Sequence, residues 1–380
     1  MQLVPTCQIH RCRWTALMLA GALLVLAAGS AASAADKELE KLHVLMVLDT
    51  SDKDLKPTLD VDRSRFLTTL IIGTPEARMK LTIFEGKNVT IKKVMSYYET
   101  GENIKRDGTA SLLFYFSGHG ATVESTGKHV ILLSGSGKPE LLERDAIREA
   151  MQKLNPGLAV MLTDSCSSYI PHVPPHVFVP PDVRAPKDPV AGFRRLFFES
   201  RGLVDINGAR EGTLAWSDAN DGGIFTRAFS KELLKEQDSD SITWEKFALQ
   251  LRGNMPEIYK AWKKDQTEES RRSGAPLDRD LVGQKDQTPQ FYALPGGGPG
   301  LMVDVVEGSV KVTDVLHASP AKEAGVRIGD VILKFDGAKI ATLADFEAAL
   351  RKAKSGSAKE FVLSVQAPAG ELVDRVVKLK

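Results

Sequence analysis

The sequence has few cysteines, no surplus of either charge and only one long hydrophobic run. Its 380 residues carry 50 lysines and arginines against 49 acidic residues, a formal net charge of +1. Because no basic surplus exists to neutralise phosphates, nucleic acid is not an expected partner. Hydrophobic residues form 43% of the chain and charged residues 26%, so a disordered chain and a multi-spanning membrane protein are both excluded.

The one long hydrophobic run lies near the amino terminus. Arg11 and Arg13 precede an apolar stretch at 14–28, and the sequence Ala-Ser-Ala at 32–34 matches a signal-peptidase site. We therefore expect residues 1–34 to be a signal peptide. The mature protein would be extracytoplasmic, either periplasmic or secreted, with no stable membrane span. A retained membrane anchor is the alternative, although the run is short for a span.

Cysteine occurs three times, at Cys7, Cys12 and Cys166. Signal cleavage would leave only Cys166, and one cysteine cannot form an internal disulfide even in a compartment that allows one. A lone thiol is either a buried small hydrophobic group or a reactive one. The residues that flank Cys166 favour a reactive thiol.

Short apolar runs alternate with amphipathic stretches between residues 43 and 223, the pattern of a parallel sheet covered by helices. We expect strands, apolar on both faces, at His43–Leu48, Lys80–Phe84, Ser111–Phe116, Leu158–Leu162 and Thr213–Trp216. We expect helices at Asp62–Ile72, Ile91–Glu99, Leu141–Leu154, Phe225–Lys235 and Thr243–Lys263. Seven prolines from Pro171 to Pro189 predict an exposed, extended loop. The Gly/Pro run at 295–300 predicts a linker before a separate domain.

Two of the predicted strands end in residues that carry chemistry. The third ends in Ser-Gly-His-Gly at 117–120, and the fourth ends in Thr-Asp-Ser-Cys at 163–166. Neighbouring parallel strands present their carboxyl ends at one edge of a sheet, so we expect His119 and Cys166 to share a crevice. The imidazole can take the thiol proton as a general base and leave a thiolate nucleophile. The amides of Gly120 and Cys166 are the expected oxyanion donors.

These two motifs together resemble those of the caspase and metacaspase family of cysteine peptidases. The resemblance continues through Glu211-Gly212-Thr213-Leu214-Ala215-Trp216-Ser217, Gly222-Gly223-Ile224-Phe225-Thr226 and Gln287-Thr288-Pro289-Gln290. It implies an α/β fold over residues 42–294, a caspase-like three-layer sandwich with a mostly parallel central sheet. It also implies that His119 is the general base and Cys166 the nucleophile, with no cofactor and no metal in the chemistry.

The resemblance further implies cleavage after Arg or Lys, because metacaspases surround the basic side chain of the substrate with acidic residues. The matching substrate-binding positions are Asp62, Ser117 and Asp164, and a carboxylate pair suits a guanidinium. Two alternatives stay open: Asp62 caps its helix, or Asp60 takes its place.

Metal binding has little support in the sequence. The other histidines lack the spacing of zinc ligands. The segment at 218–222 is similar to a calcium loop but lacks the closing glutamate, so a solvated turn is favoured. Calcium activation, known in some metacaspases, is kept as an alternative.

After a linker at 295–299, residues 300–380 resemble bacterial PDZ domains, small and rich in β-structure. The resemblance rests on the series Ser-Pro-Ala at 319–321, Ala-Gly-Val at 324–326 and Gly-Asp-Val-Ile at 329–332. It implies that peptide C-termini add a strand to the sheet edge, with their carboxylate on the first loop. The matching positions are Gly300, Leu301, Met302 and Val303. Phe346 and Leu350 either line this groove or pack in the core.

The sequence thus predicts an exported cysteine-type endopeptidase with a PDZ domain, acting on protein or peptide substrates. The alternative is a catalytically weak or inactive caspase-like scaffold for protein interactions, because Ser-Ser-Tyr at 167–169 replaces the usual glycine-containing turn after the nucleophile. The exposed proline-rich loop contains Arg184 and Lys187, so self-cleavage at either residue is a further hypothesis. An inert surface loop is the competing interpretation.

Overall fold

The computed structural model describes residues 38–123, 128–165, 184–295, 298–316, 319–355 and 359–378. The predicted signal peptide, Cys166 and most of the proline-rich loop lie outside these residues, so the hypotheses about them stay predictions. None of the described helices combines the length and the apolar character needed to span a membrane.

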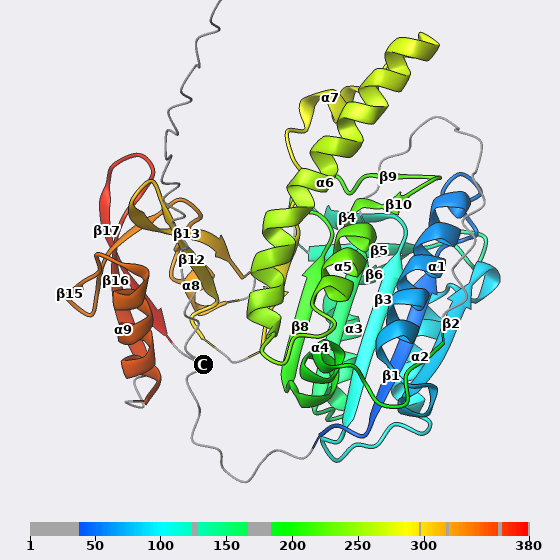
Figure 1. Cartoon of the computed structure of the whole chain (residues 1–380), viewed down its shortest axis with the longest axis horizontal. Coiled ribbons are helices and arrows are strands. Elements are labelled where there is room, and N and C mark those ends of the chain that lie inside the picture. Colours follow the sequence, from blue (N-terminus) through cyan, green and yellow to red (C-terminus); the bar gives the residue numbers. More distant parts are fainter. Residues whose placement is uncertain are drawn as a thin grey trace, which may run out of the picture. The chain divides into compact units, whose positions relative to one another are not determined.

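A six-stranded sheet forms the centre of the first domain, in the order β11-β8-β7-β3-β1-β2 (Figure 1). Its strands are β1 (Lys41–Leu48), β2 (Met79–Glu85), β3 (Ala110–Ser117), β7 (Leu158–Asp164), β8 (Gly202–Asn207) and β11 (Gln290–Ala293). All neighbours are parallel except β11, which runs antiparallel to β8. Every residue of β3 and β7 is buried, as expected for central strands covered on both faces.

Helices cover both faces of this sheet and make three layers (Figure 1). One face packs against α1 (Lys56–Gly73), α5 (Ile224–Lys235) and α6 (Trp244–Ser273); the other packs against α2 (Ile91–Thr100) and α3 (Arg144–Lys153). The period of two in β1 assigns the sides: Val44 and Met46 join the first core, whereas Leu45 and Val47 join the second. The predicted fold class is confirmed.

The fifth strand is the main error of the sequence prediction. Residues 213–216 form no strand of the central sheet; their backbone is held instead by Gln284 and Gln287, whose Oε1 atoms accept hydrogen bonds from Leu214 N and Trp216 N. The real fifth strand, β8, contains the wholly buried Asp205. A search for uniformly apolar runs misses such a strand.

Three helix boundaries differ from the prediction, and the first is the start of α1, at Lys56 rather than at Asp62. Residues Glu140–Glu143 form strand β6, so the helix expected from residue 141 begins only at Arg144. Helix α6 continues ten residues past its expected end at Lys263, to Ser273, where Gly274 adopts the left-handed conformation that closes helices.

Small elements complete this domain. A three-stranded sheet, β4-β5-β6, joins β4 (Gly120–Val123) and β5 (Lys128–Leu133) to β6, and a two-stranded sheet pairs β9 (Ser217–Asp218) with β10 (Gly222–Gly223). The short helical segments are η1 (Glu76–Arg78), η2 (Gly86–Asn88), α4 (Ala191–Phe193), η3 (Arg194–Glu199) and α7 (Arg279–Gly283).

The second domain is an antiparallel sheet in the order β12-β13-β14-β16-β17, with β15 paired to β14. Its elements are β12 (Leu301–Val306), β13 (Ser309–Val315), α8 (Pro320–Glu323), β14 (Val331–Phe335), β15 (Ala338–Lys339), α9 (Leu343–Ser355), β16 (Glu360–Gln366) and β17 (Leu372–Lys378). It has a core of its own, in which Phe335 stacks on Phe361 with ring centroids 4.4 Å apart. Strand β12 lies at the edge of this sheet.

Candidate active site

The carboxyl ends of β3 and β7 meet at one edge of the central sheet. Ser117 and Asp164 are paired across the two strands, and Gly118 N donates a hydrogen bond to the Asp164 carbonyl oxygen over 3.1 Å. Gly118 has no room for a side chain, because a Cβ there would lie 2.7 Å from Phe116 Cζ. The chain therefore turns directly after β3 and carries His119, whose side chain is 32% exposed.

The imidazole of His119 has a carboxylate partner that the sequence analysis missed. Its Nε2 lies 3.0 Å from Asp52 Oδ2, in the loop that follows β1. The other oxygen, Oδ1, accepts hydrogen bonds from the backbone N–H groups of Asp54 and Leu55. Burial opposes ionisation of Asp52, but these hydrogen bonds and His119 outweigh it and lower the pKa of Asp52. The sequence pattern could have indicated Asp52, because β1 is a neighbour of β3 and its carboxyl end lies at the same edge of the sheet.

A second carboxyl group, Asp49, lies near the same imidazole. It is wholly buried and accepts a hydrogen bond of 2.8 Å from Ser134 Oγ and another of 3.3 Å from Ser134 N. Burial raises the pKa of Asp49, while the two bonds and the charge of His119 act in the opposite direction. The imidazole therefore lies in a locally acidic environment.

The segment after His119 packs against the end of β7. A Cβ added at Gly120 would lie 2.8 Å from Ser165 Cβ, so Gly120 touches the residue that directly precedes Cys166. Ser165 Oγ and Thr163 Oγ1 both donate hydrogen bonds to Asn207 Oδ1, over 2.8 and 2.7 Å. Asn207, in β8, thereby fixes the end of β7. Cys166 comes next in the chain and lies outside the described residues.

The three predicted substrate-binding residues lie in one buried cluster. Asp62 Oδ2 accepts a hydrogen bond of 2.7 Å from Ser117 Oγ. Asp164 Oδ2 accepts bonds from the backbone and the hydroxyl of Thr226, at 3.0 and 2.8 Å. The hydroxyl of Tyr115 lies 2.7 Å from Thr226 Oγ1 and also forms a hydrogen bond with the Ser117 side chain, so it links the two halves.

Burial decides the charge of this cluster. Desolvation, followed by the neighbouring Asp164 carboxylate, raises the pKa of Asp62 to about 8. Desolvation also raises the pKa of Asp164, to about 6, against the two hydrogen bonds from Thr226. Two carboxylates so placed cannot both ionise easily, so the cluster retains a proton near neutral pH.

Two glycines bring the backbone onto these carboxyl groups. A Cβ at Gly223 would lie 2.0 Å from Asp164 Oδ2, and one at Gly222 would lie 2.3 Å from Asp62 Oδ1. Gly223 N donates a 2.7 Å hydrogen bond to Asp62 Oδ1. Strand β10 therefore closes over the cluster, which only glycine permits.

The register of α1 contradicts one of the two alternatives for Asp62 and places the other on the helix surface. The helix begins at Lys56, so Asp62 lies inside it, and the interpretation of Asp62 as a helix cap is wrong. The Asp60 carboxylate instead pairs with Lys56 Nζ at 2.7 Å on the exposed side of the helix.

The acidic turn at 218–222 is partly solvated, as expected from the sequence, with Asn220 exposed, but it begins at a buried carboxylate. Asp218 is buried; its Oδ1 accepts bonds from Asn220 N and Asp221 N, and its Oδ2 accepts a bond from Trp262 Nε1. Asp221 pairs with Arg227 at 2.7 Å. Across the described ranges, no three His, Cys, Asp or Glu side chains come together as a metal site.

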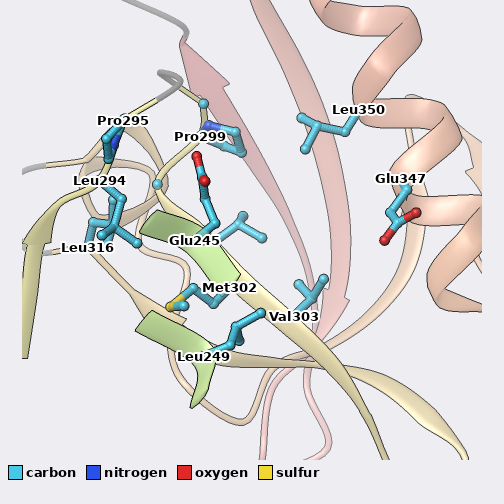
Figure 2. A pocket seen from close by; sticks show the side chains of 13 residues that line it. Glu245, Leu249, Leu294, Pro295, Pro299, Met302, Val303, Leu316, Glu347 and Leu350 are labelled. Carbon is cyan, nitrogen blue, oxygen red and sulfur yellow. The ribbon is translucent and has the colours of Figure 1, made fainter. Parts of the chain in front are cut away.

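The predicted peptide-binding residues of the second domain line a groove of about 340 Å³ (Figure 2). Gly300, Leu301, Met302 and Val303 all line it, and in Figure 2 Leu350 projects from α9 across from Met302 and Val303. Phe346 is 3% exposed and stacks edge-on against Phe335 in the core. Of the two helix residues considered for the groove, only Leu350 lines it.

Comparison with known protein families shows the family to which this chain belongs. A match described as Caspase domain covers residues 85–294, more than half of the chain. The chain belongs to the caspase-domain family. A second match, described as PDZ domain, covers residues 297–364. No match was found among curated proteins. A solved structure of an HtrA-type protease with a decapeptide is similar at 19% identity with a TM-score of 0.20, over 22% of this chain and 28% of that one, a likeness too small to carry an argument.

These matches confirm the architecture expected from the sequence, a caspase domain followed by a PDZ domain. The caspase-domain match supports a protease in the general sense, a hydrolase. The PDZ domain is a peptide-binding module.

Proposed function

We propose that this caspase-domain protein is a cysteine-type endopeptidase with His119 as general base and Cys166 as nucleophile. The observation that carries the proposal is the contact of the His119–Gly120 segment with Ser165, which directly precedes Cys166. Asp52 supports it, because a carboxylate on Nε2 favours the tautomer that has its proton there. The other nitrogen, Nδ1, is then the atom that accepts the thiol proton.

The reaction proceeds in two steps, acylation of the enzyme and hydrolysis of the acyl-enzyme. His119 takes the proton from the Cys166 thiol, and the thiolate attacks the scissile carbonyl carbon. The resulting oxyanion accepts hydrogen bonds from the amides of Gly120 and Cys166. As the intermediate collapses, the imidazolium gives its proton to the leaving amine and an acyl-enzyme remains. Water, deprotonated by His119, then attacks the acyl carbon and releases the thiol.

We propose cleavage after Arg or Lys, supported by the two buried carboxyl groups of Asp62 and Asp164. A guanidinium that enters this cluster would allow both carboxyl groups to ionise, because its positive charge would compensate theirs away from water. An aspartate side chain would meet repulsion there instead. Cleavage after Asp is therefore not expected.

We also propose that the PDZ groove binds peptide C-termini and that the protein is exported. The groove lies along the open edge of β12, where a peptide can add as a strand. Export rests on the signal-like pattern at residues 1–34.

The direct test is a cleavage profile on a peptide library, measured for the wild type, Cys166→Ala and His119→Ala. We expect cuts after Arg or Lys by the wild type and none by either variant, with folding unchanged by circular dichroism. The competing function, an inactive scaffold, is favoured by the Ser-Ser-Tyr sequence at 167–169. A wild type that cleaves nothing would establish the scaffold, and a variant that still cleaves would place the chemistry elsewhere.

A further inference from the structure

The PDZ groove carries a charge pattern of one sign. Thirteen residues line it, and the two that are charged are both acidic, Glu245 and Glu347. The remaining lining is apolar or glycine, including Leu249, Met302 and Leu350. In Figure 2, Glu347 projects from α9 on one side, while the carboxylate of Glu245 lies beside Pro299 on the other.

One of these carboxylates comes from the caspase domain. Glu245 and Leu249 lie one turn apart on α6, whose other side is anchored by Trp244 and Phe247 in the core of that domain. Both anchors are almost fully buried, so the position of Glu245 is set by the packing of α6 rather than by a flexible loop. The groove is therefore a composite site with walls from two domains.

Among the residues that the structure describes, neither carboxylate has a close ion pair. Glu347 faces Arg351 on the same helix, 3.7 Å away and beyond hydrogen-bond distance, and both side chains are partly exposed. A pair of this kind contributes little and leaves Glu347 able to attract a second cation. Of the cations near Glu245 on α6, Lys246 donates its ammonium hydrogen bond to Ser241 O, and Arg252 interacts with Asp314 and Asp304.

We propose that this groove selects peptides whose last residue is Lys or Arg. The terminal carboxylate would lie on the loop at 298–302, and the basic side chain would lie between Glu245 and Glu347. A basic C-terminal residue supplies both charges that the site needs, an anion for the backbone amides and a cation for the two glutamates.

This ligand is also the product of the proposed cleavage. An endopeptidase that cuts after Arg or Lys releases an amino-side fragment that ends in that residue with a free carboxylate. The inference thus rests on the proposed specificity and extends it: the PDZ domain retains fragments that the active site has just made, including a chain cut at successive basic residues.

The test measures peptide binding to the full chain carrying Cys166→Ala, which prevents cleavage. Fluorescent decapeptides that differ only in their end would be compared by polarisation: Lys, Leu, and Lys amide. We expect the Lys peptide to bind about three- to tenfold more tightly than the Leu peptide, the size expected for two partly exposed ion pairs. The amide should bind more weakly than the free Lys terminus.

Matched variants identify the residues responsible. Glu245→Gln and Glu347→Gln should each reduce the preference for Lys over Leu. Glu257→Gln should leave it unchanged, because Glu257 is an exposed residue of α6 that pairs with Lys260 and does not line the groove. Equal or tighter binding of the Leu peptide would overturn the proposal. So would tighter Lys binding in Glu245→Gln, because Glu245 would then compete with the ligand carboxylate.

The two proposals fail separately. A cleavage profile without Arg or Lys, together with Lys selection by the groove, would overturn only the link between product and groove. Cleavage after Arg or Lys without Lys selection in binding would overturn the groove assignment and leave the active site untouched.

Discussion

Replacement of Asp52 by asparagine tests the catalytic geometry most sharply. Asp52→Asn keeps a side-chain oxygen that accepts from Asp54 N and Leu55 N, so the turn before α1 should survive. The lost quantity is the negative charge 3.0 Å from His119 Nε2. Without it the imidazolium is less stable, so the thiolate–imidazolium pair forms less readily and thiol reactivity shifts to higher pH.

The size of the effect follows from exposure. The side chains of His119 and Asp52 are 32% and 27% exposed, so water screens the charge more than at a fully buried triad. We expect kcat to fall about 10- to 100-fold, or about 1.4–2.7 kcal/mol, with KM little changed. The pKa of Asp52 is already lowered, so the wild type keeps this charge throughout a neutral assay.

The assay is kcat and KM across pH 5–9, with the rate of Cys166 alkylation recorded in parallel. Asp54→Asn is the matched control, because Asp54 is exposed and lies two residues away. An Asp52→Asn variant with the kcat and pH profile of the wild type would refute the role of Asp52. A fall in thermal stability without a shift of the alkylation profile would show a structural role only.

Three further predictions concern the acidic cluster and the proline-rich loop. Because the pKa of Asp62 is raised to about 8, KM for Arg substrates should fall as pH rises toward 8, and Asp164→Asn should weaken this dependence in steady-state assays. Gly223→Ala should cost about 1–3 kcal/mol of stability by thermal or urea unfolding, because its Cβ would overlap Asp164 Oδ2; a variant as stable as the wild type contradicts this packing. Arg184 and Lys187 are exposed, so mass spectrometry should find self-cleavage at one of them in active protein and none in the nucleophile variant.

The central strands can be predicted from the sequence because strands buried on both faces are continuous runs of apolar residues. Strands β1, β3 and β7 are continuous apolar runs, and the rule that parallel strands end at one edge places the His119 motif beside the end of β7. Strand β8 could not be predicted in this way. Its Asp205 is wholly buried because Arg144, from α3, supplies a buried positive charge 2.5 Å away. Such a pair joins residues 61 positions apart and cannot be read from a local pattern.

The candidate site, too, could be predicted only in part from the sequence. Asp62 and Asp164 are found by resemblance, but the closure of Gly222 and Gly223 over them depends on tertiary contacts. In the PDZ domain, helical periodicity puts Phe346 and Leu350 on one face, and only the packing separates the core residue from the groove residue.

Covalent trapping tests the central claim most directly. A peptide that ends in an arginyl chloromethyl ketone would be added to the active protein, and the adduct would be mapped by mass spectrometry. We expect a single adduct on Cys166, formed rapidly in the wild type and at least about 100-fold more slowly in His119→Ala, because the thiolate is lost. An adduct on any other residue, or equally fast labelling of Cys166 in His119→Ala, would contradict the His119–Cys166 dyad.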